Sequence, residues 1–397
     1  MEPPDEISGL ELAEAFYTEV VGPLLRSHSP PAGAEAQLKC AAALIGPGSE
    51  VLGFDDATSR DHDWGPRLQI FLAADGQDPA AQQATADSIV RMLRSKLPAK
   101  FRGYSTHFED VGDDDPGVAL LALGTAGNIT HRVKVSTLSG YLEEYFGPGL
   151  GAGPGPAAAG GWRDWLRIPA QKLRTVGIGG RVFCDSTGEL TAVRTLIAGY
   201  YPKDVWLFLL HAGYSRLGQL SHFMGRCGQT GDELGSRLIA AKLVHDVMSV
   251  CFLLERQYAP YAKWFGKGFS NLACAPAMTP LLSKAMDSGS WEARDATLGQ
   301  VYTLLGQLLN SKAAFTGIPA QTEHVVQFWT RPFQVPNSGG WCDGGLITLI
   351  AGAIEDAELR QLCERRPVGS VEQHFDSTEV LEDPCLLAAI GEVMYRV

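Results

Sequence analysis

The sequence predicts an α+β protein with two domains. Short β-type apolar runs concentrate in the first half of the chain, whereas long amphipathic helical runs fill the second half. With 397 residues, the chain is long enough for more than one hydrophobic core. We therefore expect an α/β domain over residues 1–190, built on a mixed sheet with flanking helices, followed by a helical bundle over residues 191–397.

The first half alternates helical and extended patterns. Ser8 and Glu11 have the spacing of a capping box, which places a helix start there. A second helix is expected over 79–97 and a third over 138–146. Strands are expected at 67–72, 101–108, 118–123, 130–137 and 181–185, and Ala41 to Ile45 forms a short buried segment. Residues 147–161 are rich in Gly, Ala and Pro and predict a flexible loop.

The second half is predominantly helical in pattern. Apolar residues recur at helical spacing over 203–224, 232–258 and 291–310, and a final pair of helices is expected near 342–363 and 384–395. Strands that come first and helices that come later fit an α+β domain followed by a helical bundle.

Composition limits the possible functions. A net charge of −12 argues against broad, non-specific nucleic-acid binding and weakly favours small cationic substrates. The eight cysteines lie far apart with no CxxC pair, which argues against a zinc site and a disulfide framework. No apolar run reaches eighteen residues, and the acidic start lacks signal-peptide features, so we expect no membrane span and a cytoplasmic protein.

The stretch from residue 48 to 63 carries the strongest chemical signal. Gly48 and Ser49 form a turn that can offer backbone N–H groups and a hydroxyl to a phosphate. Asp61 and Asp63 are expected on an extended segment, where residues at i and i+2 point to the same side. Two such carboxylates suit Mg²⁺, which binds through one or two carboxylates plus substrate phosphates.

This pattern resembles the signature of the polymerase-beta-like nucleotidyltransferase superfamily. The resemblance implies that Gly48 and Ser49 hold a nucleoside triphosphate and that Asp61 and Asp63 bind Mg²⁺. It also implies a third carboxylate on the strand at 130–137, where this chain has Lys134. That departure removes the usual third metal ligand or general base.

Other charged residues are candidates for the site. Arg67 flanks the acidic pair, and Lys134 and Arg237 are assigned with it to nucleotide or substrate binding. Glu233 is a catalytic candidate beside Asp61 and Asp63, although its i,i+4 spacing to Arg237 also suits a helix-surface ion pair. Lys263 and Lys267 lie among five aromatic residues at a helix end and could meet phosphates, with interface packing as the alternative.

Three segments also resemble a family described only as a domain of unknown function. They are the stretches at 200–206, 258–266 and 369–378. Members of that family join a nucleotidyltransferase-like N-terminal domain to a helical C-terminal domain, and they imply no established reaction.

Three functions stay open from the sequence. The first is a transferase that moves a nucleotidyl group from an NTP to a small-molecule acceptor with Mg²⁺. The second is an aminoacyl-tRNA-dependent, arginine-containing cyclodipeptide synthase, in which Asp61, Asp63 and Glu233 bind a guanidinium instead of a metal. The third is a non-catalytic nucleotide-binding protein.

Overall fold

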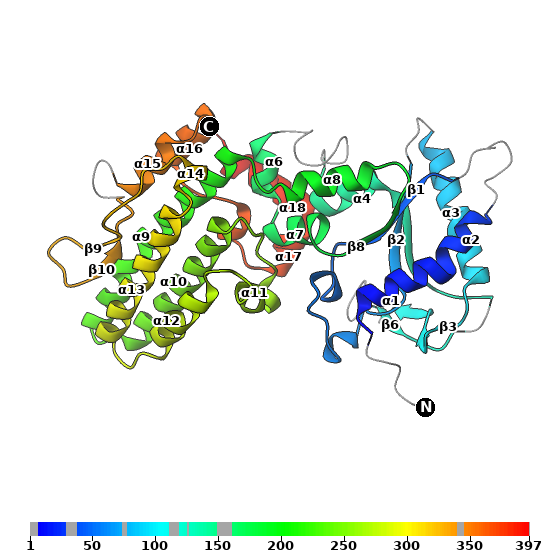
Figure 1. Cartoon of the computed structure of the whole chain (residues 1–397), viewed down its shortest axis with the longest axis horizontal. Coiled ribbons are helices and arrows are strands. Elements are labelled where there is room, and N and C mark those ends of the chain that lie inside the picture. Colours follow the sequence, from blue (N-terminus) through cyan, green and yellow to red (C-terminus); the bar gives the residue numbers. More distant parts are fainter. Residues whose placement is uncertain are drawn as a thin grey trace. The chain divides into compact units, whose positions relative to one another are not determined.

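A computed structural model describes residues 7–28, 38–73, 78–110, 119–124, 127–148, 161–339 and 345–396. The chain forms two compact units (Figure 1). Unit 1 comprises Met1–Gly161 and Lys172–Gly199, and unit 2 comprises Trp162–Gln171 and Tyr200–Val397. The sequence placed the division at residue 190, whereas the structure places it at 199 and groups the segment 162–171 with the helical unit.

Unit 1 is built on a four-stranded mixed sheet in the order β7-β2-β1-β8. Its strands are β1 (Cys40–Leu44), β2 (Arg67–Leu72), β7 (Arg132–Thr137) and β8 (Arg181–Asp185). β1 is antiparallel to β2 and β8, and β2 is parallel to β7. As a result, the end of β1 and the starts of the other three strands lie at one edge, which we call the turn edge.

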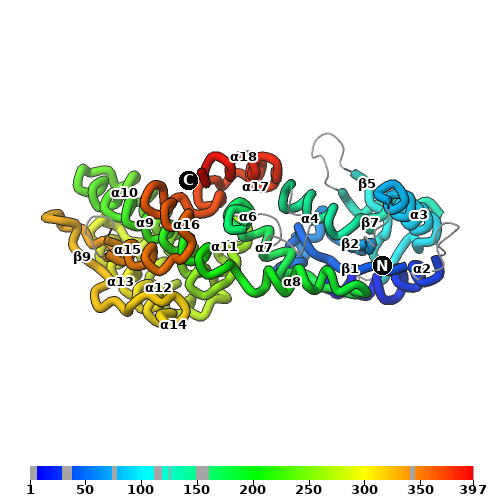
Figure 2. Tube along the Cα trace, turned by 90° about the horizontal axis from the view of Figure 1, so that it is seen from above, coloured from blue at the N-terminus to red at the C-terminus, as the bar shows by residue number. Residues whose placement is uncertain are grey.

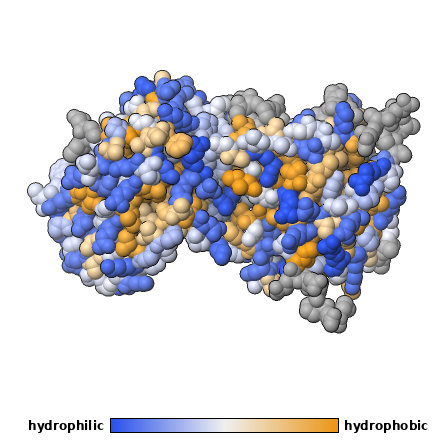
Figure 3. All heavy atoms as spheres, in the orientation of Figure 1, coloured by the Kyte–Doolittle hydropathy of each residue, from blue (hydrophilic) through white to orange (hydrophobic). Residues whose placement is uncertain are grey.

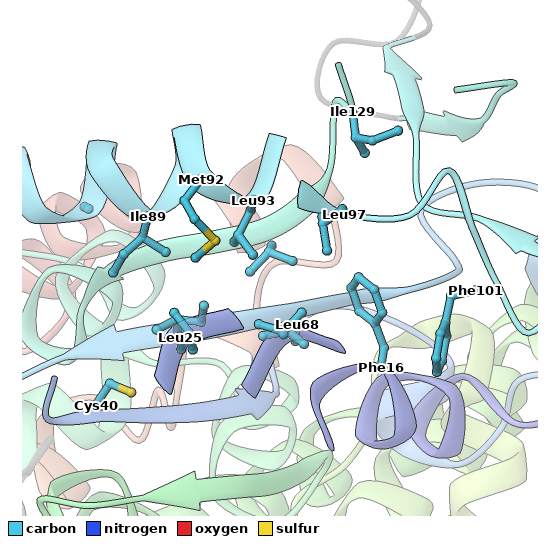
Figure 4. Packing of buried hydrophobic residues seen from close by; sticks show 14 of the residues in the cluster. Phe16, Leu25, Cys40, Leu68, Ile89, Met92, Leu93, Leu97, Phe101 and Ile129 are labelled. Carbon is cyan, nitrogen blue, oxygen red and sulfur yellow. The ribbon is translucent and has the colours of Figure 1, made fainter. Parts of the chain in front are cut away.

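Helices and the sheet enclose the core of unit 1. The helices are α1 (Gly9–Phe16), the π-helical turn η1 (Tyr17–Val21), α2 (Gly22–Arg26), α3 (Pro79–Lys96), α4 (Leu138–Phe146), α7 (Ala170–Gly177) and α8 (Glu189–Ala198). The predicted capping box is present, because the Ser8 and Glu11 side chains each cap the other's backbone N–H. Figure 4 shows Ile89 and Leu93 of α3 directed toward the layer that holds Leu25 and Leu68.

Two short hairpins replace the longer strands expected between 101 and 123. They pair β3 (Lys100–Phe101) with β4 (Tyr104–Ser105), and β5 (Phe108–Asp110) with β6 (Ala119–Leu121). The predicted strand over 101–108 is wrong, because Arg102 and Gly103 adopt positive φ values of 48° and 86° and turn the chain. The Gly/Ala/Pro-rich loop falls outside the described residues from 149 to 160.

Unit 2 is helical, as the sequence predicts. Its long helices are α9 (Lys203–Gln229), α10 (Glu233–Leu254), α12 (Ala275–Asp287) and α13 (Trp291–Asn310). The shorter ones are α6 (Trp162–Arg167), α11 (Ala262–Phe269), α14 (Ala313–Thr316), α15 (Leu346–Gly352), α16 (Ala357–Arg365), η4 (Val371–Gln373), α17 (Thr378–Glu382) and α18 (Pro384–Met394). β9 (Val325–Gln327) and β10 (Gln334–Pro336) form a hairpin.

Two long helices of unit 2 begin at capping residues. Asp232 caps α10 by accepting from the N–H of Gly235, and Ser290 caps α13 by accepting from that of Ala293. α9 and α10 lie side by side in Figures 1 and 2 and form the most extensive helix pair of the unit.

The surface is mixed in polarity. On the face shown in Figure 3, hydrophilic and hydrophobic residues alternate over both units. Within the described residues, every helix is too short or too polar to cross a membrane.

Candidate functional site

The Gly48–Ser49 turn lies at the turn edge of the unit 1 sheet. Gly48 has a φ of 137°, and a Cβ at this position would fall 2.6 Å from Oε2 of Glu50 and would also clash with Arg67. The position therefore requires glycine. Ser49 precedes η2 (Glu50–Leu52), a short 3₁₀ helix that carries the chain away from β1.

Arg67, the first residue of β2, braces this turn. Its Nε donates to Oε1 of Glu50 at 2.8 Å, and its Nη2 donates to the carbonyl oxygen of Pro47 at 2.7 Å. The two side chains are only 14% and 5% exposed. Arg67, which the sequence assigned to substrate binding, thus holds the Gly–Ser turn through a buried ion pair.

Asp61 and Asp63 do not lie on a strand, so the expectation that they point to one side of an extended segment is wrong. They follow η3 (Thr58–Arg60), and β2 begins only at Arg67. Asp63 adopts a φ of 50°, which a strand does not allow. Asp61 is exposed and its Oδ1 lies 2.8 Å from Nδ1 of the exposed His62.

Asp63 reaches the turn edge and pairs with Arg132. Its Oδ1 accepts from the guanidinium of Arg132 and from the N–H of Ala119 at 3.2 Å. Both members of the ion pair are about one-third exposed, at 32% and 33%. Arg132 is the register partner of Arg67 in the parallel β2–β7 pair, so the two arginines begin adjacent strands. The sequence analysis missed Arg132, although its place at the start of a parallel strand was a usable signal.

Lys134 lies two residues further along β7. Its Nζ donates to both carboxylate oxygens of Glu144 on α4, at 2.6 and 2.7 Å. The pair is largely exposed. At the position where the resemblance implies a third carboxylate, the chain therefore presents a lysine that is engaged with a neighbouring helix.

The remaining predicted site residues belong to unit 2. Glu233 accepts from Nη2 of Arg294 at 3.3 Å and from the N–H of Trp291 at 3.1 Å, which ties α10 to the start of α13. The i,i+4 partner assigned to Glu233, Arg237, is exposed on α10. Lys263 and Lys267 are exposed on α11. Glu233 lies in unit 2, whereas Asp61 and Asp63 lie in unit 1.

Unit 2 contains a pocket whose lining residues the sequence did not identify as one site. Its volume is about 660 Å³, a size typical of small-molecule sites. α9, α10, the segment 257–265 and the segment 370–381 surround it. Three lining tyrosines, Tyr200, Tyr201 and Tyr258, have ring centroids 4.8 to 5.0 Å apart.

Glu372 is the acidic group of this pocket with the most altered environment. Its Oε2 accepts from the N–H of Ala170 at 2.6 Å, and its Oε1 lies 3.4 Å from the hydroxyl of Ser370. Burial raises the pKa of Glu372 to about 7 despite these hydrogen bonds, which favour the ionised form. The other lining carboxylate within a helix, Asp246, accepts from Nε of Arg216 at 2.8 Å.

Comparison with known proteins shows one family similarity and one distant structural similarity. A family model described as "Domain of unknown function (DUF4037)" matches residues 165–265. Comparison with curated proteins gives no match. Among solved structures, a nucleotidyltransferase-like protein from Exiguobacterium sibiricum 255-15 is 10% identical, with 77% of each chain covered and a TM-score of 0.32. The chain thus contains a region similar to the DUF4037 family, and that region includes Tyr200, Tyr201 and Tyr258.

Proposed function

We propose that the chain is a transferase whose unit 1 binds a nucleoside triphosphate at the turn edge and passes a nucleotidyl group to a small-molecule acceptor. One observation carries the proposal. The antiparallel pairing of β1 with β2 brings the Gly48–Ser49 turn and the Asp63 carboxylate to the same edge of a mixed sheet. A phosphate-binding turn beside a carboxylate is the arrangement that a metal-bound triphosphate needs.

Within the described residues no three His, Cys, Asp or Glu side chains cluster to hold a metal, so a Mg²⁺ bound here would rely on one or two carboxylates and the substrate phosphates. Asp63 and the exposed Asp61 offer carboxylate oxygens, which Mg²⁺ prefers, and substrate phosphates complete its shell. When bound, Mg²⁺ would neutralise charge on the triphosphate. For Asp63 to serve as a ligand, it must release Arg132, and the partial exposure of that pair allows this exchange.

Once Asp63 releases it, Arg132 can itself bind the triphosphate. A guanidinium beside a glycine turn suits bidentate contacts with phosphate oxygens. Gly48 permits close backbone approach, and Ser49 adds its hydroxyl. The buried Glu50–Arg67 pair keeps the turn in place throughout.

A further carboxylate, that of Asp110, lies on the other side of β6 from Asp63. Asp110 pairs in register with Ala119, and the N–H of Ala119 donates to Asp63. Residues paired across an antiparallel ladder lie about 5 Å apart. Asp110 is our candidate for the base that accepts the proton of the acceptor hydroxyl, with β6 between it and Asp63.

The non-catalytic alternative has support of its own. Asp63 is paired with Arg132, and Lys134 is paired with Glu144, so the edge holds more cations than a typical metal site. Such an edge is suited to hold a nucleotide without turnover. The aminoacyl-tRNA-dependent alternative stays a prediction, and no contact of the described residues favours it.

Calorimetric titration with ATP, GTP, CTP and UTP in the presence of Mg²⁺ tests the proposal. We expect saturable binding of at least one nucleotide and an affinity at least tenfold lower in Asp63→Asn. Asp87→Asn is the matched control, because Asp87 is exposed on α3 and accepts a hydrogen bond from Nε2 of Gln83. Equal binding by wild type and Asp63→Asn would refute the site.

A turnover assay separates the two functions. Pyrophosphate release from the bound nucleotide, measured against a panel of small alcohols and amines, supports the transferase. Binding that depends on Asp63 without any release would favour the non-catalytic protein instead.

A further inference from the structure

The pocket of unit 2 contains a carboxylate whose hydrogen-bond donors are both neutral. Glu372 accepts from the Ala170 N–H and lies within reach of the Ser370 hydroxyl. In the described part of the chain, neither a lysine nor an arginine forms an ion pair with it. Glu372 is half-buried, and a carboxylate with reduced access to water is stabilised as an anion by a positive charge beside it.

Aromatic rings make up the wall beside this carboxylate. Burial and then the negative charge of Glu372 raise the pKa of Tyr201 well above its ordinary range, which places the two groups within electrostatic reach. Tyr200 and Tyr258 pack on Tyr201 at centroid distances of 4.8 and 5.0 Å. The faces of such rings carry negative charge density and attract cations.

Tyr200 has an unusual backbone conformation. Tyr200 adopts a φ of 75°, which is rare for a bulky residue and is ordinarily left to glycine. Its hydroxyl is buried and has no hydrogen-bond partner. The ring of Tyr200 therefore lies at the pocket wall with its hydroxyl unsatisfied.

We propose that this pocket binds an organic ammonium compound, with its charged nitrogen beside Glu372 and its apolar body against the tyrosines. The volume of about 660 Å³ calls for a molecule with an organic body, because a lone cation would leave most of it unfilled. Pro260 and Phe265 add apolar surface to the lining. The inference concerns unit 2 alone and does not depend on nucleotide binding by unit 1.

The other charged groups around the pocket do not supply the positive charge that Glu372 lacks. Arg216 is committed to Asp246 and to the carbonyl oxygen of Gln373. His245 stacks on Phe265 with its ring exposed and weakly favours the ionised form of Glu372. The further titratable or charged groups nearby are Lys242, Tyr261, His374 and Asp376 on the lining, Arg256 over the Tyr200 ring, and Tyr395, whose pKa the carboxylate raises.

Binding should therefore release a proton at neutral pH. The cation stabilises the ionised form of Glu372, whose pKa near 7 leaves about half of it protonated beforehand. We expect the affinity to fall by up to about tenfold per pH unit below pH 6. In calorimetry, the measured heat should vary with the ionisation enthalpy of the buffer.

The test uses the full chain and two probes of nearly equal shape. They are 2-phenylethylammonium, which carries the charge, and 2-phenylethanol, which does not. We expect the cation to bind at least tenfold more tightly than the alcohol, and Glu372→Gln to lower its affinity at least tenfold. Glu379→Gln is the matched control, since Glu379 is exposed on α17 and bonds to Ser377; its affinity should stay within twofold of wild type.

Three results would overturn the inference. The first is equal binding of the cation and the alcohol, which would mark a purely apolar pocket. The second is undiminished binding by a Glu372→Gln variant that shows the wild-type circular dichroism spectrum. The third is the absence of saturable binding of both 2-phenylethylammonium and benzyltrimethylammonium at millimolar concentration. A second variant, Tyr258→Leu, removes one ring and should weaken benzyltrimethylammonium at least fivefold, and an unchanged affinity would also count against the site.

Discussion

Two glutamate–cation pairs in unit 1 differ in burial more than in geometry. Glu50 accepts from Nε of Arg67 at 2.8 Å, and Glu144 accepts from Nζ of Lys134 at 2.6 Å. Arg67 and Glu50 are 14% and 5% exposed, whereas Lys134 and Glu144 are 46% and 65% exposed. The same substitution, Glu to Gln, removes one charge from each pair and nearly preserves shape.

The expected costs of these substitutions differ severalfold. Glu50→Gln leaves the Arg67 guanidinium buried without its counter-charge, and breaking a buried pair in this way costs about 3–5 kcal/mol of unfolding free energy. The residual contact of Arg67 with the Pro47 carbonyl oxygen favours the lower end, about 3 kcal/mol. Glu144→Gln leaves Lys134 in water, and exposed pairs are worth about 0.2–1 kcal/mol.

Hydrogen exchange read by mass spectrometry measures both changes in the intact protein. Because the chain has two units, a single denaturation midpoint would mix their stabilities. Peptides that cover β1 and β2 report unit 1 directly, and their exchange should accelerate about a hundredfold in Glu50→Gln and less than about fivefold in Glu144→Gln. Similar acceleration in the two variants would refute the argument that burial, rather than contact geometry, decides the strength of these pairs.

Two further predictions concern backbone space and pH. Gly180 and Gly53 have similar φ values of 67° and 70°, yet a Cβ at Gly180 would overlap the Leu44 carbonyl oxygen, whereas a Cβ at Gly53 would meet nothing within 4 Å. Hydrogen exchange of the unit 1 peptides should show a loss of about 1 kcal/mol for Gly53→Ala and at least about 3 kcal/mol for Gly180→Ala, and equal losses would contradict the steric reasoning. Glu372 has a pKa raised from 4.5 to about 7, so the folded state binds its proton more tightly than the unfolded state. The free energy of unfolding of unit 2, followed by hydrogen exchange, should therefore fall by up to about 3 kcal/mol as pH rises from 4.5 through 7. Glu372→Gln should reduce that fall. An identical dependence of this free energy on pH in both proteins would exclude Glu372 as its source.

Much of the helical structure follows from local chemistry. Ser290 caps the helix Trp291–Asn310, whose bounds the apolar spacing predicts without error. The Ser8–Glu11 box starts α1 where expected. Such signals act over three or four residues, so a single sequence contains all of the information they need.

The candidate site depends on information of longer range. Side chains alternate between the two faces only inside a strand. The chain turns at Asp63 and Gly65, which has a φ of 140°, so β2 begins only at Arg67. The pairing of Asp63 with Arg132 depends on the register between β2 and β7. The unit 2 pocket is harder still, because Tyr200, Tyr258 and Glu372 come from three distant segments.

The register of β7 also places two cations, Arg132 and Lys134, at the sheet edge that we propose binds a nucleotide. Residues 132 and 134 lie on the same face of the strand, since strand side chains alternate, and both are basic. Each is neutralised by a partly or fully exposed carboxylate, Asp63 or Glu144, that it can exchange at little cost. A slip of one residue between β2 and β7 would send both cations to the opposite face and bring Val133 to the turn edge. A triphosphate that draws Arg132 from Asp63 would bind a cation and free a carboxylate for Mg²⁺ in one exchange. Under the proposed function, Lys134 would contribute to phosphate binding at the position where the resemblance implies an acidic residue.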